Sequence, residues 1–348
     1  MTDLTIYLER ATRYLRHADL AAVPGWQRDR PFHVASLAQG EYNMNYLVTQ
    51  EQNRWVLRVN VGTQIDRDDQ ILYEYRALKL LEPSGVTPIP YYVDPTQGIK
   101  TDEGKHLGIL LMEYRPGETL RYERDLAAAA RLFARTHSLD VAEADNHLIR
   151  ESRPLSMTYE ECSHLLPVYL ESDLADPALR DYLCEVLDWA DEARHREDYF
   201  VSDPWPCIIN TEVNSGNFIV DRERETIHLV DWEKPLWGDP SQDLSHFCVP
   251  TTTLWKTDYL MSPDDRQTFL DAYRQAIFDA HLRDTIEDRV RLRDPFNCLR
   301  GISWSAMAWV TYQTGRHALQ NQDTFVKVSA YMDIDFVRDL FAPHMGNS

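Results

Sequence analysis

The segment Cys207–Pro235 constrains the fold and function of this chain more than any other. It contains two acidic residues, Glu212 and Asp231, with Asn217 between them. Short apolar runs bounded by turn-forming residues predict small strands on both sides of a polar loop and directly before Asp231. Two carboxylates and a carboxamide are therefore expected at strand ends and in a tight loop. Oxygen ligands of this kind suit Mg²⁺ carrying a phosphate better than they suit zinc.

Composition narrows the possible partners. The chain has 348 residues and is 43% hydrophobic, enough for about two domains with real cores. Its net charge of −20, with only six lysines, weighs against nucleic acid and anionic membranes as partners. A cationic small molecule suits this charge, although an acidic surface kept for solubility is the simpler interpretation. We find no apolar leader, no membrane-spanning run and no paired cysteines, so we expect a cytoplasmic protein with reduced thiols.

The N-terminal third combines strands with a leading helix and one main helix. The first two strands are joined by a loop over 38–45 that contains Gly40. This loop either closes backbone amides over a phosphate or forms an ordinary hairpin. Arg58 on the third strand and Glu74 on the main helix are either an ion pair that joins helix and sheet or, as is more common for a single pair, ordinary surface residues. The expected helices are 4–20 and 69–81, and the expected strands are 32–37, 46–48, 55–61, 88–93 and 108–113.

The fifth expected strand ends in a domain boundary. It is a continuous apolar run, Gly108–Glu113, as expected for a strand buried on both faces. It stops at the turn-rich segment Arg115–Thr119, and the pattern beyond is mostly helical. His137 ends the first of these helices, and we interpret it as a packed residue because no other His or Cys lies at ligand spacing. The expected later helices cover 127–137, 159–170, 178–197, 264–280, 285–294 and a last region that includes 301–309.

Three segments then follow in a fixed order: Asn210–Asn217 (NTEVNSGN), Val230–Glu233 (VDWE) and Asp239–Leu244 (DPSQDL). Together with the glycine loop, Arg58 and Glu74, this order resembles the protein-kinase-like fold of aminoglycoside phosphotransferases and choline kinases. That family has a His-Gly-Asp-x-x-x-x-Asn or His-Asn-Asp-x-x-x-x-Asn loop, then Ile-Asp-Trp-Glu, then Asp-Pro-x-x-Asp-Leu. The resemblance covers most of the chain, from about residue 32 to residue 309.

The resemblance implies an α+β, bilobal fold. Residues 1–113, including the leading helix, would form a nucleotide-binding lobe with an antiparallel sheet and one main helix. Residues 114–119 would be the hinge, and residues 120–348 a mostly helical catalytic and substrate lobe.

The resemblance also implies a nucleotide site on the N-terminal lobe. Arg58 matches the strand residue that binds the α and β phosphates, and Glu74 matches the carboxylate that orients it. Gly40 lies in the loop that would cover the phosphates. The adenine or guanine base would bond to the backbone of the hinge residues Glu113, Tyr114 and Arg115.

The catalytic roles fall on the segment Cys207–Pro235. Asn217 and Asp231 match the Mg²⁺ ligands that bridge the nucleotide phosphates, and Glu212 matches the base or orienter of the acceptor hydroxyl. The remaining matches are supporting residues: Asn210 and Asp243 would brace the loop, and Trp232, Glu233 and Trp304 would contact the acceptor.

Two positions depart from the family motif. Glu212 stands where the family has Asp, and the extra methylene costs on the order of 10²-fold in rate unless the loop shifts to compensate. Asn210 stands where the family has His, and it can hydrogen-bond but not fill the same volume. Both metal-ligand positions are retained. Because phosphoryl transfer depends mainly on positioning and charge neutralisation, we favour an active enzyme over a pseudoenzyme.

The sequence therefore predicts a Mg²⁺-dependent phosphotransferase that moves the γ-phosphate of ATP or GTP to a hydroxyl of a small molecule. The acceptor classes are aminoglycosides, choline- or ethanolamine-like alcohols and sugars. Acidic and aromatic residues of the helical part suit a cationic acceptor through cation–π contacts. The alternative is a nucleotide-binding pseudokinase that acts as a regulatory or scaffold module. Neither interpretation involves nucleic acid or a membrane, and both leave the oligomeric state open.

Overall fold

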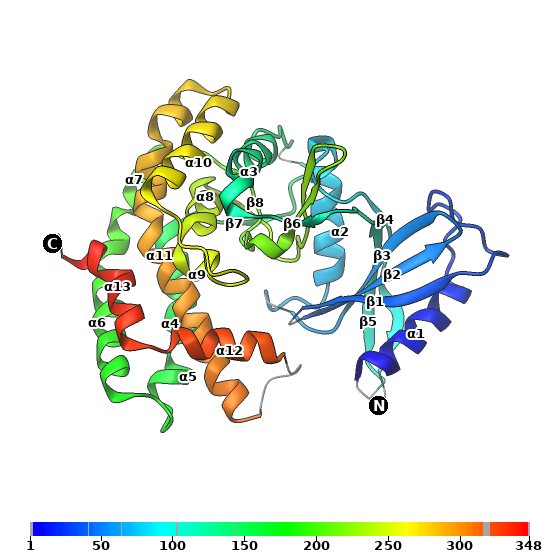
Figure 1. The fold of residues 1–348 in the computed structure, drawn as a ribbon, viewed down its shortest axis with the longest axis horizontal. Helices are drawn as coiled ribbons and strands as arrows, with labels where there is room; N and C mark the ends of the chain where they lie inside the picture. Colours follow the sequence, from blue (N-terminus) through cyan, green and yellow to red (C-terminus); the bar gives the residue numbers. More distant parts are fainter. Residues whose placement is uncertain are drawn as a thin grey trace. The chain divides into compact units, whose positions relative to one another are not determined.

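The computed structural model describes residues 3–40, 42–63, 65–101, 104–142, 144–315 and 321–346. The chain divides into two compact units (Figure 1). The sequence predicts two contiguous lobes, whereas two later segments of the chain pack with the N-terminal one. Unit 1 comprises Met1–Glu118, Asp140–Leu148 and Ile219–Pro235, and unit 2 comprises Thr119–Leu139, Ile149–Phe218 and Leu236–Ser348.

Unit 1 is built on a five-stranded antiparallel sheet in the order β1-β2-β3-β5-β4. The strands are β1 (His33–Gln39), β2 (Asn43–Gln50), β3 (Asn53–Asn60), β4 (Pro90–Lys100) and β5 (His106–Glu113). The prediction that the last of these is buried on both faces is confirmed, because every residue from Leu107 to Met112 is buried. The antiparallel sheet predicted for this part of the chain is also confirmed.

Two helices cover the two faces of this sheet (Figure 1). Helix α1 (Asp3–His17) contributes Ala11 and Leu15 to a core shared with alternate residues of the strands. Helix α2 (Gln70–Leu81) packs on the opposite face, where Ile71 lies against Gly108. A Cβ on that glycine would come within 2.4 Å of Ile71 Cγ2, so the close approach of helix and strand requires glycine.

The glycine loop is smaller than the sequence predicts. Strand β1 continues to Gln39 and β2 begins at Asn43, which leaves a tight turn in place of the expected loop over 38–45. The Gly40 N–H donates to Asn43 O at 2.9 Å, as in an ordinary hairpin. Glu41, also part of the predicted loop, lies outside the described residues.

A hairpin from the middle of the chain joins unit 1. Strands β9 (Phe218–Asp221) and β10 (Thr226–Leu229) form a small sheet with β6 (Glu118–Thr119), in the order β10-β9-β6. The Leu229 N–H donates to Val86 O at 2.9 Å, which ties the end of the hairpin to unit 1. Asp231, two residues later, is therefore positioned by unit 1.

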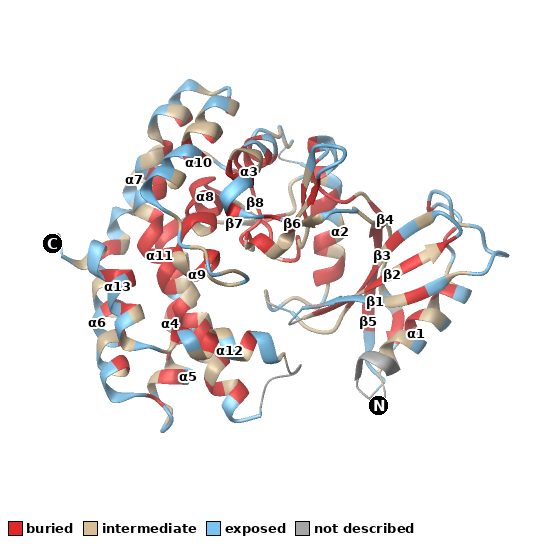
Figure 2. Cartoon of the chain, in the orientation of Figure 1, coloured by how far each residue is buried: buried red, intermediate tan, exposed pale blue. Residues whose placement is uncertain are grey.

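Unit 2 is mostly helical, and its central helix, α11, is buried along much of its length (Figure 2). The sequence predicts two separate helices here, but α11 runs through Pro295 without a break. Side chains on both sides of this proline are buried, and their packing outweighs the lost backbone hydrogen bond. The helices are α3 (Tyr122–His137), α4 (Pro154–Leu165), α5 (Pro167–Leu170), α6 (Pro177–Ala193), α7 (Asp198–Ser202), α8 (Ser241–Cys248), α9 (Pro250–Thr253), α10 (Pro263–Ala276), α11 (Ala280–Gln313), α12 (Gln322–Tyr331) and α13 (Ile334–Met345).

A second small sheet in unit 2 supports the polar loop. Strands β7 (Ile149–Arg150), β11 (Leu236–Gly238) and β8 (Cys207–Ile209) pair in the order β7-β11-β8. Strand β8 is fully buried and leads directly into the loop. All five cysteines are free thiols, as predicted. Across the described residues, the helices are either too short or too polar to cross a bilayer.

Candidate active site

Arg58 is the centre of the polar cluster in unit 1. Its Nη1 donates to Glu74 Oε1 at 2.5 Å and to Asp231 Oδ1 at 2.9 Å, while its Nε donates to Asn45 Oδ1 at 3.0 Å. The side chains of Arg58 and Glu74 are 4% and 2% exposed, whereas that of Asp231 is 29% exposed. The pair predicted from the sequence is therefore present and buried, and it extends to the carboxylate at the end of the hairpin.

The charges of this cluster shift the pKa of Arg58 and of Glu74. Burial lowers the pKa of Arg58, but the carboxylates of Glu74, Asp231 and Glu233 outweigh burial and hold it above its ordinary value. Burial raises the pKa of Glu74, the Arg58 charge lowers it, and Asp231 raises it, with a net shift upward. A permanently charged guanidinium held by carboxylates is a suitable partner for nucleotide phosphates.

The two residues after Asp231 are buried in unit 1. Trp232 is 1% exposed, and its indole N–H donates to Leu229 O at 2.9 Å. Glu233 is 5% exposed and accepts a hydrogen bond from the Asn43 side chain. Both side chains hold the segment in place, and the Trp232 indole is packed inside unit 1.

The predicted hinge residues are the last residue of β5 and the two residues after it. Backbone N–H of Glu113 donates to Ile89 O at 2.8 Å, and its carboxylate pairs with Arg115 at 2.7 Å. The Arg54 guanidinium lies 5.8 Å from the ring centroid of Tyr114, in a cation–π contact. The Glu113 N–H is thus already satisfied within unit 1.

The loop between β8 and β9 is braced by its own side chains. Asn210 Oδ1 accepts from the Glu212 N–H at 2.8 Å, and Asn217 Nδ2 donates to Glu212 O at 2.7 Å. Asn214 Oδ1 accepts from the Gly216 N–H at 3.0 Å, which caps the single turn that ends at Asn217. Asn210 therefore supports the loop by hydrogen bonding to it, as a short polar side chain does in a turn.

Asp243 at the start of α8 holds the first residues of this loop. Its two oxygens accept from the N–H groups of Asn210 at 2.7 Å and Thr211 at 2.9 Å. His137 Nε2 lies 3.4 Å from Asp243 Oδ2, and its Nδ1 lies 3.1 Å from the Tyr273 hydroxyl. The prediction that His137 is a packed residue is confirmed, since its side chain is fully buried.

Thr211 is in a strained backbone conformation that the sequence analysis did not predict. Its φ is +70°, a left-handed value that is rare for a β-branched residue. Asp243 binds its N–H, and Arg300 Nη1 donates to its carbonyl oxygen at 3.0 Å, so both sides of the residue are fixed. The family motif has Gly or Asn at this position, and these residue types adopt positive φ most readily. The motif itself therefore indicates a left-handed backbone at residue 211.

Arg300 on α11 is the second residue that the sequence analysis missed. Its guanidinium pairs with Glu212 Oε1 at 3.3 Å and Glu161 Oε2 at 3.2 Å, and it is 13% exposed. Burial lowers the pKa of Arg300, but Glu161 and Glu212 outweigh burial and raise it above its ordinary value. The candidate catalytic carboxylate is therefore held by a charged arginine. The sequence feature that points to Arg300 is that it is the single charged residue among the mostly apolar and small residues of 295–308.

Trp304, one turn further along α11, belongs to an aromatic cluster. Its ring centroid lies 5.5 Å from that of Trp255, with the rings nearly perpendicular at 78°. Both rings pack against the buried residues Ala308, Tyr312 and Val328. Trp304 is partly exposed, so unlike Trp232 it is accessible at the surface of unit 2.

Comparisons with solved structures define the class of the fold. An ethanolamine kinase from Plasmodium vivax matches with 12% identity over 98% of this chain and 90% of its own, with a TM-score of 0.66. A choline kinase from Cryptosporidium parvum matches with 12% identity, coverage of 95% and 97%, and a TM-score of 0.66. A spectinomycin phosphotransferase in complex with ADP and spectinomycin matches with 15% identity, coverage of 89% and 91%, and a TM-score of 0.58. The fold is that of the protein-kinase-like phosphotransferases.

The chain belongs to the phosphotransferase enzyme family, whose family model matches residues 33–294. This match confirms the family resemblance and the predicted α+β class. No curated protein matches the chain.

Proposed function

We propose that this chain is a Mg²⁺-dependent phosphotransferase that transfers the γ-phosphate of ATP or GTP to a hydroxyl of a small molecule. The observation that carries the proposal is the buried cluster of Arg58, Glu74 and Asp231. It combines a cation for phosphates, a carboxylate that orients this cation, and a more exposed carboxylate for a metal ion. The family match and the ADP and AMP complexes of two spectinomycin phosphotransferase structures support a nucleotide as the donor.

Asn217 and Asp231 fit a magnesium ion by their chemistry. Asn217 Nδ2 donates a hydrogen bond to Glu212 O. The Asn217 Oδ1 therefore points away from this contact and is a potential metal ligand. Asp231 presents a partly exposed carboxylate from a residue with φ of +65°. Amide and carboxylate oxygens are the ligands that Mg²⁺ prefers, and the bound ion would neutralise the nucleotide phosphates.

We assign the orientation of the acceptor hydroxyl to Glu212. Its carboxylate would accept the hydroxyl proton, while Arg300 fixes the side chain from the other side. The longer Glu side chain reaches the arginine, and this contact accounts for Glu in place of the family Asp. The nucleotide base would bond to the backbone of Tyr114 and Arg115, and the turn at Gly40 would cover the phosphates.

The contact between Arg300 and Glu212 also defines the alternative function. If Arg300 keeps the Glu212 carboxylate from every acceptor, the chain is a nucleotide-binding pseudokinase with a regulatory or scaffold role. Both functions require nucleotide binding, and only the first requires transfer.

The test measures ADP release with Mg·ATP, and GDP release with Mg·GTP, in the presence of choline, ethanolamine, spectinomycin, other aminoglycosides and sugars. We expect acceptor-dependent release that Asp231→Ala abolishes and that Asp271→Ala, an exposed change on α10, leaves unchanged. Thermal stabilisation by nucleotide without release across the panel supports the pseudokinase. A melting temperature that neither nucleotide changes in the presence of Mg²⁺ would contradict both functions.

A further inference from the structure

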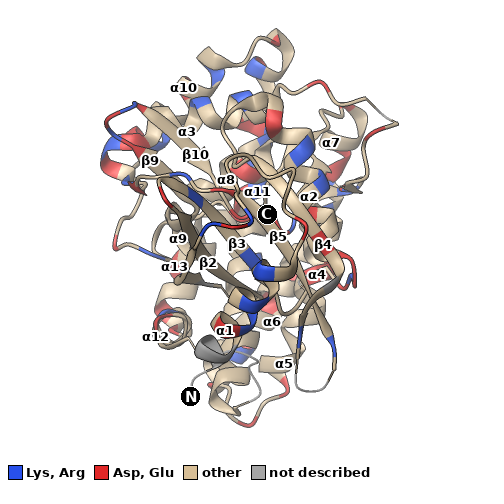
Figure 3. Ribbon diagram, turned by 90° about the vertical axis from the view of Figure 1, so that its right-hand side faces the viewer, with Lys and Arg blue, Asp and Glu red and all other residues tan. Residues whose placement is uncertain are grey.

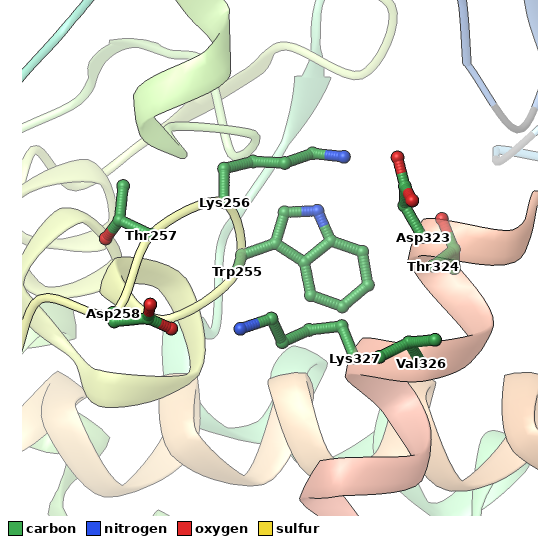
Figure 4. A pocket seen from close by; sticks show the side chains of 8 residues that line it. All are labelled: Trp255, Lys256, Thr257, Asp258, Asp323, Thr324, Val326 and Lys327. Carbon is green, nitrogen blue, oxygen red and sulfur yellow. The ribbon is translucent and has the colours of Figure 1, made fainter.

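Unit 2 contains a surface pocket of about 320 Å³ between the loop after α9 and the first turns of α12. Figure 4 shows the Trp255 indole in the middle of this pocket, with the side chains of Lys256 and Lys327 running on either side of it. The lining residues are Trp255, Lys256, Thr257, Asp258, Asp323, Thr324, Val326 and Lys327.

This pocket contains more lysines than the composition of the chain predicts. The chain has six lysines and 56 acidic residues among 348. Eight residues taken at random would include on average about 1.3 acidic residues and about 0.1 lysines. The pocket contains two of each, so its acids are close to expectation while its lysines are far above it. Along the ribbon, charged residues of both signs are otherwise interspersed (Figure 3).

These lysines form no ion pair with any residue that the structure describes. The Lys256 Nζ lies 5.9 Å from the Trp255 ring centroid, within cation–π range. A ligand cation over the same ring would meet this ammonium at close range and be repelled by it. The indole face and the two ammonium groups therefore favour a ligand with an apolar face and an anionic group.

The pocket adjoins the candidate catalytic loop. A Cβ built on Gly216 would lie 3.5 Å from Lys256 Cγ, so the lysine stem passes beside the loop that joins Glu212 to Asn217. Trp304, the accessible aromatic residue expected to contact the acceptor, packs edge-on against Trp255. A molecule on Trp255 thus lies next to the loop that, in the proposed function, orients the acceptor hydroxyl.

We propose, on the basis of the proposed function, that the acceptor carries an anionic carboxylate or phosphate group that Lys256 and Lys327 bind, with its carbon skeleton against Trp255. This proposal departs from the sequence expectation of a cationic acceptor. The net charge of −20 describes the whole chain, whereas this pocket balances two lysines against Asp258 and Asp323, and its lysines form no ion pair with any described residue.

The experiment uses four sugar-derived probes that differ mainly in charge: D-gluconate, D-glucose 6-phosphate, D-glucose and D-glucosamine. Their binding to the full chain is measured by ligand-observed NMR titration in the presence of Mg·ADP, so that no turnover is required. We expect at least one anionic probe to bind about 10-fold more tightly than glucose, and glucosamine to bind no better than glucose. Which anion binds more tightly distinguishes a carboxylate from a phosphate.

Variants then assign the effect to the pocket. Lys256→Met and Lys327→Met should each weaken the anionic probe about 3- to 10-fold, and Lys327→Glu should favour glucosamine over gluconate. Asp258→Asn should leave anion binding unchanged or strengthen it, and Lys105→Met in unit 1 is the control for loss of a lysine elsewhere. All these positions are at least partly exposed, so the variants should fold.

The outcomes separate this inference from the proposed function. Tightest binding by glucose or glucosamine, or no binding by any probe, overturns the anionic acceptor. An anion preference that survives Lys256→Met/Lys327→Met overturns the assignment of the anion site to these two lysines. None of these results depends on the affinity for Mg·ADP. This affinity is measured on the same samples, and the proposed function depends on it.

Discussion

Arg58 Nη1 donates to both Glu74 and Asp231, at 2.5 Å and 2.9 Å. One guanidinium nitrogen therefore links strand β3, helix α2 and the segment after β10, three parts of unit 1 that are far apart in sequence. The pairing fixes the Asp231 carboxylate relative to the sheet. The same contact therefore serves the stability of unit 1 and the proposed binding of nucleotide.

Arg58→Met should destabilise the chain more at pH 8 than at pH 5. Arg58 lowers the pKa of Glu74, so its removal raises this pKa further above the ordinary value of 4.5. A raised pKa means that the folded state binds the proton more tightly than the unfolded state, and the free energy of unfolding then falls as pH rises through the folded pKa. We expect a loss of about 3–5 kcal/mol at pH 8, measured by urea unfolding, and a smaller loss at pH 5.

The control for this variant is Arg67→Met. Arg67 pairs with Asp69, and both side chains are about 40% exposed, at 39% and 41%. An exposed pair contributes about 0–1 kcal/mol, with little pH dependence over this range. Equal losses for the Arg58 and Arg67 variants would contradict the role given to the buried cluster.

Arg300→Met should lower kcat by about 10²-fold while nucleotide affinity stays unchanged. The arginine fixes Glu212 at one carboxylate oxygen and fixes the neighbouring Thr211 carbonyl, so its loss leaves the candidate base misaligned. Arg300→Lys keeps the charge without the fork of donors and should recover part of the loss. Steady-state kinetics and equilibrium binding of Mg·ATP separate the two effects.

Arg291→Met on the same helix is the matched control, because Arg291 is 76% exposed and pairs only locally with Asp288. It should leave kcat unchanged. If Arg300→Met raised kcat, the arginine would be restraining Glu212 rather than positioning it, and the positioning role would be wrong.

Glu212→Asp should lower kcat by at least about 10-fold, although it restores the family residue. A side chain shorter by one methylene draws back from Arg300, to which Glu212 Oε1 lies at 3.3 Å. Single-turnover measurements compare this variant with Glu212→Gln, which keeps the length and removes the basic carboxylate. Higher activity of Glu212→Asp than of the unmodified chain would show that the loop positions an Asp carboxylate better than a Glu carboxylate, and the role given to the contact with Arg300 would be wrong.

Thr211→Gly should be more stable than Thr211→Ala by about 1 kcal/mol, because only glycine adopts a φ of +70° without strain. The two variants differ only by the Cβ methyl group, so the difference reports mainly on the backbone. Urea unfolding of the two variants gives this difference directly. Equal stability, or a less stable Gly variant, would mean that the left-handed conformation is not strained.

The sequence predicted those parts of the molecule in which local pattern and packing agree. Alternation along Trp55–Val61 and the continuous apolar run of Gly108–Glu113 predicted strands that the structure contains. The pair of Arg58 and Glu74 followed from their spacing on a strand and a helix. The family match covers residues 33–294, a range that includes these strands and both members of the pair.

Other features depended on tertiary packing that no local pattern contains. The helix expected over 285–294 does not end there, because burial on both sides of Pro295 lets α11 continue. Trp232 was expected to contact the acceptor, but it packs inside unit 1. The contact of Arg300 with Glu212 joins residues 88 positions apart, so neither residue indicates the other in the sequence.

The central claim is that Asp231 and Asn217 bind a metal ion that holds a nucleotide, and calorimetric titration of the chain with ATP and GTP tests it most directly. We expect binding of at least one nucleotide with Mg²⁺, at least about 10-fold weaker binding with EDTA, and a similar loss in Asp231→Asn and Asn217→Ala. Nucleotide binding of equal strength with and without Mg²⁺, unchanged in both variants, would contradict the claim.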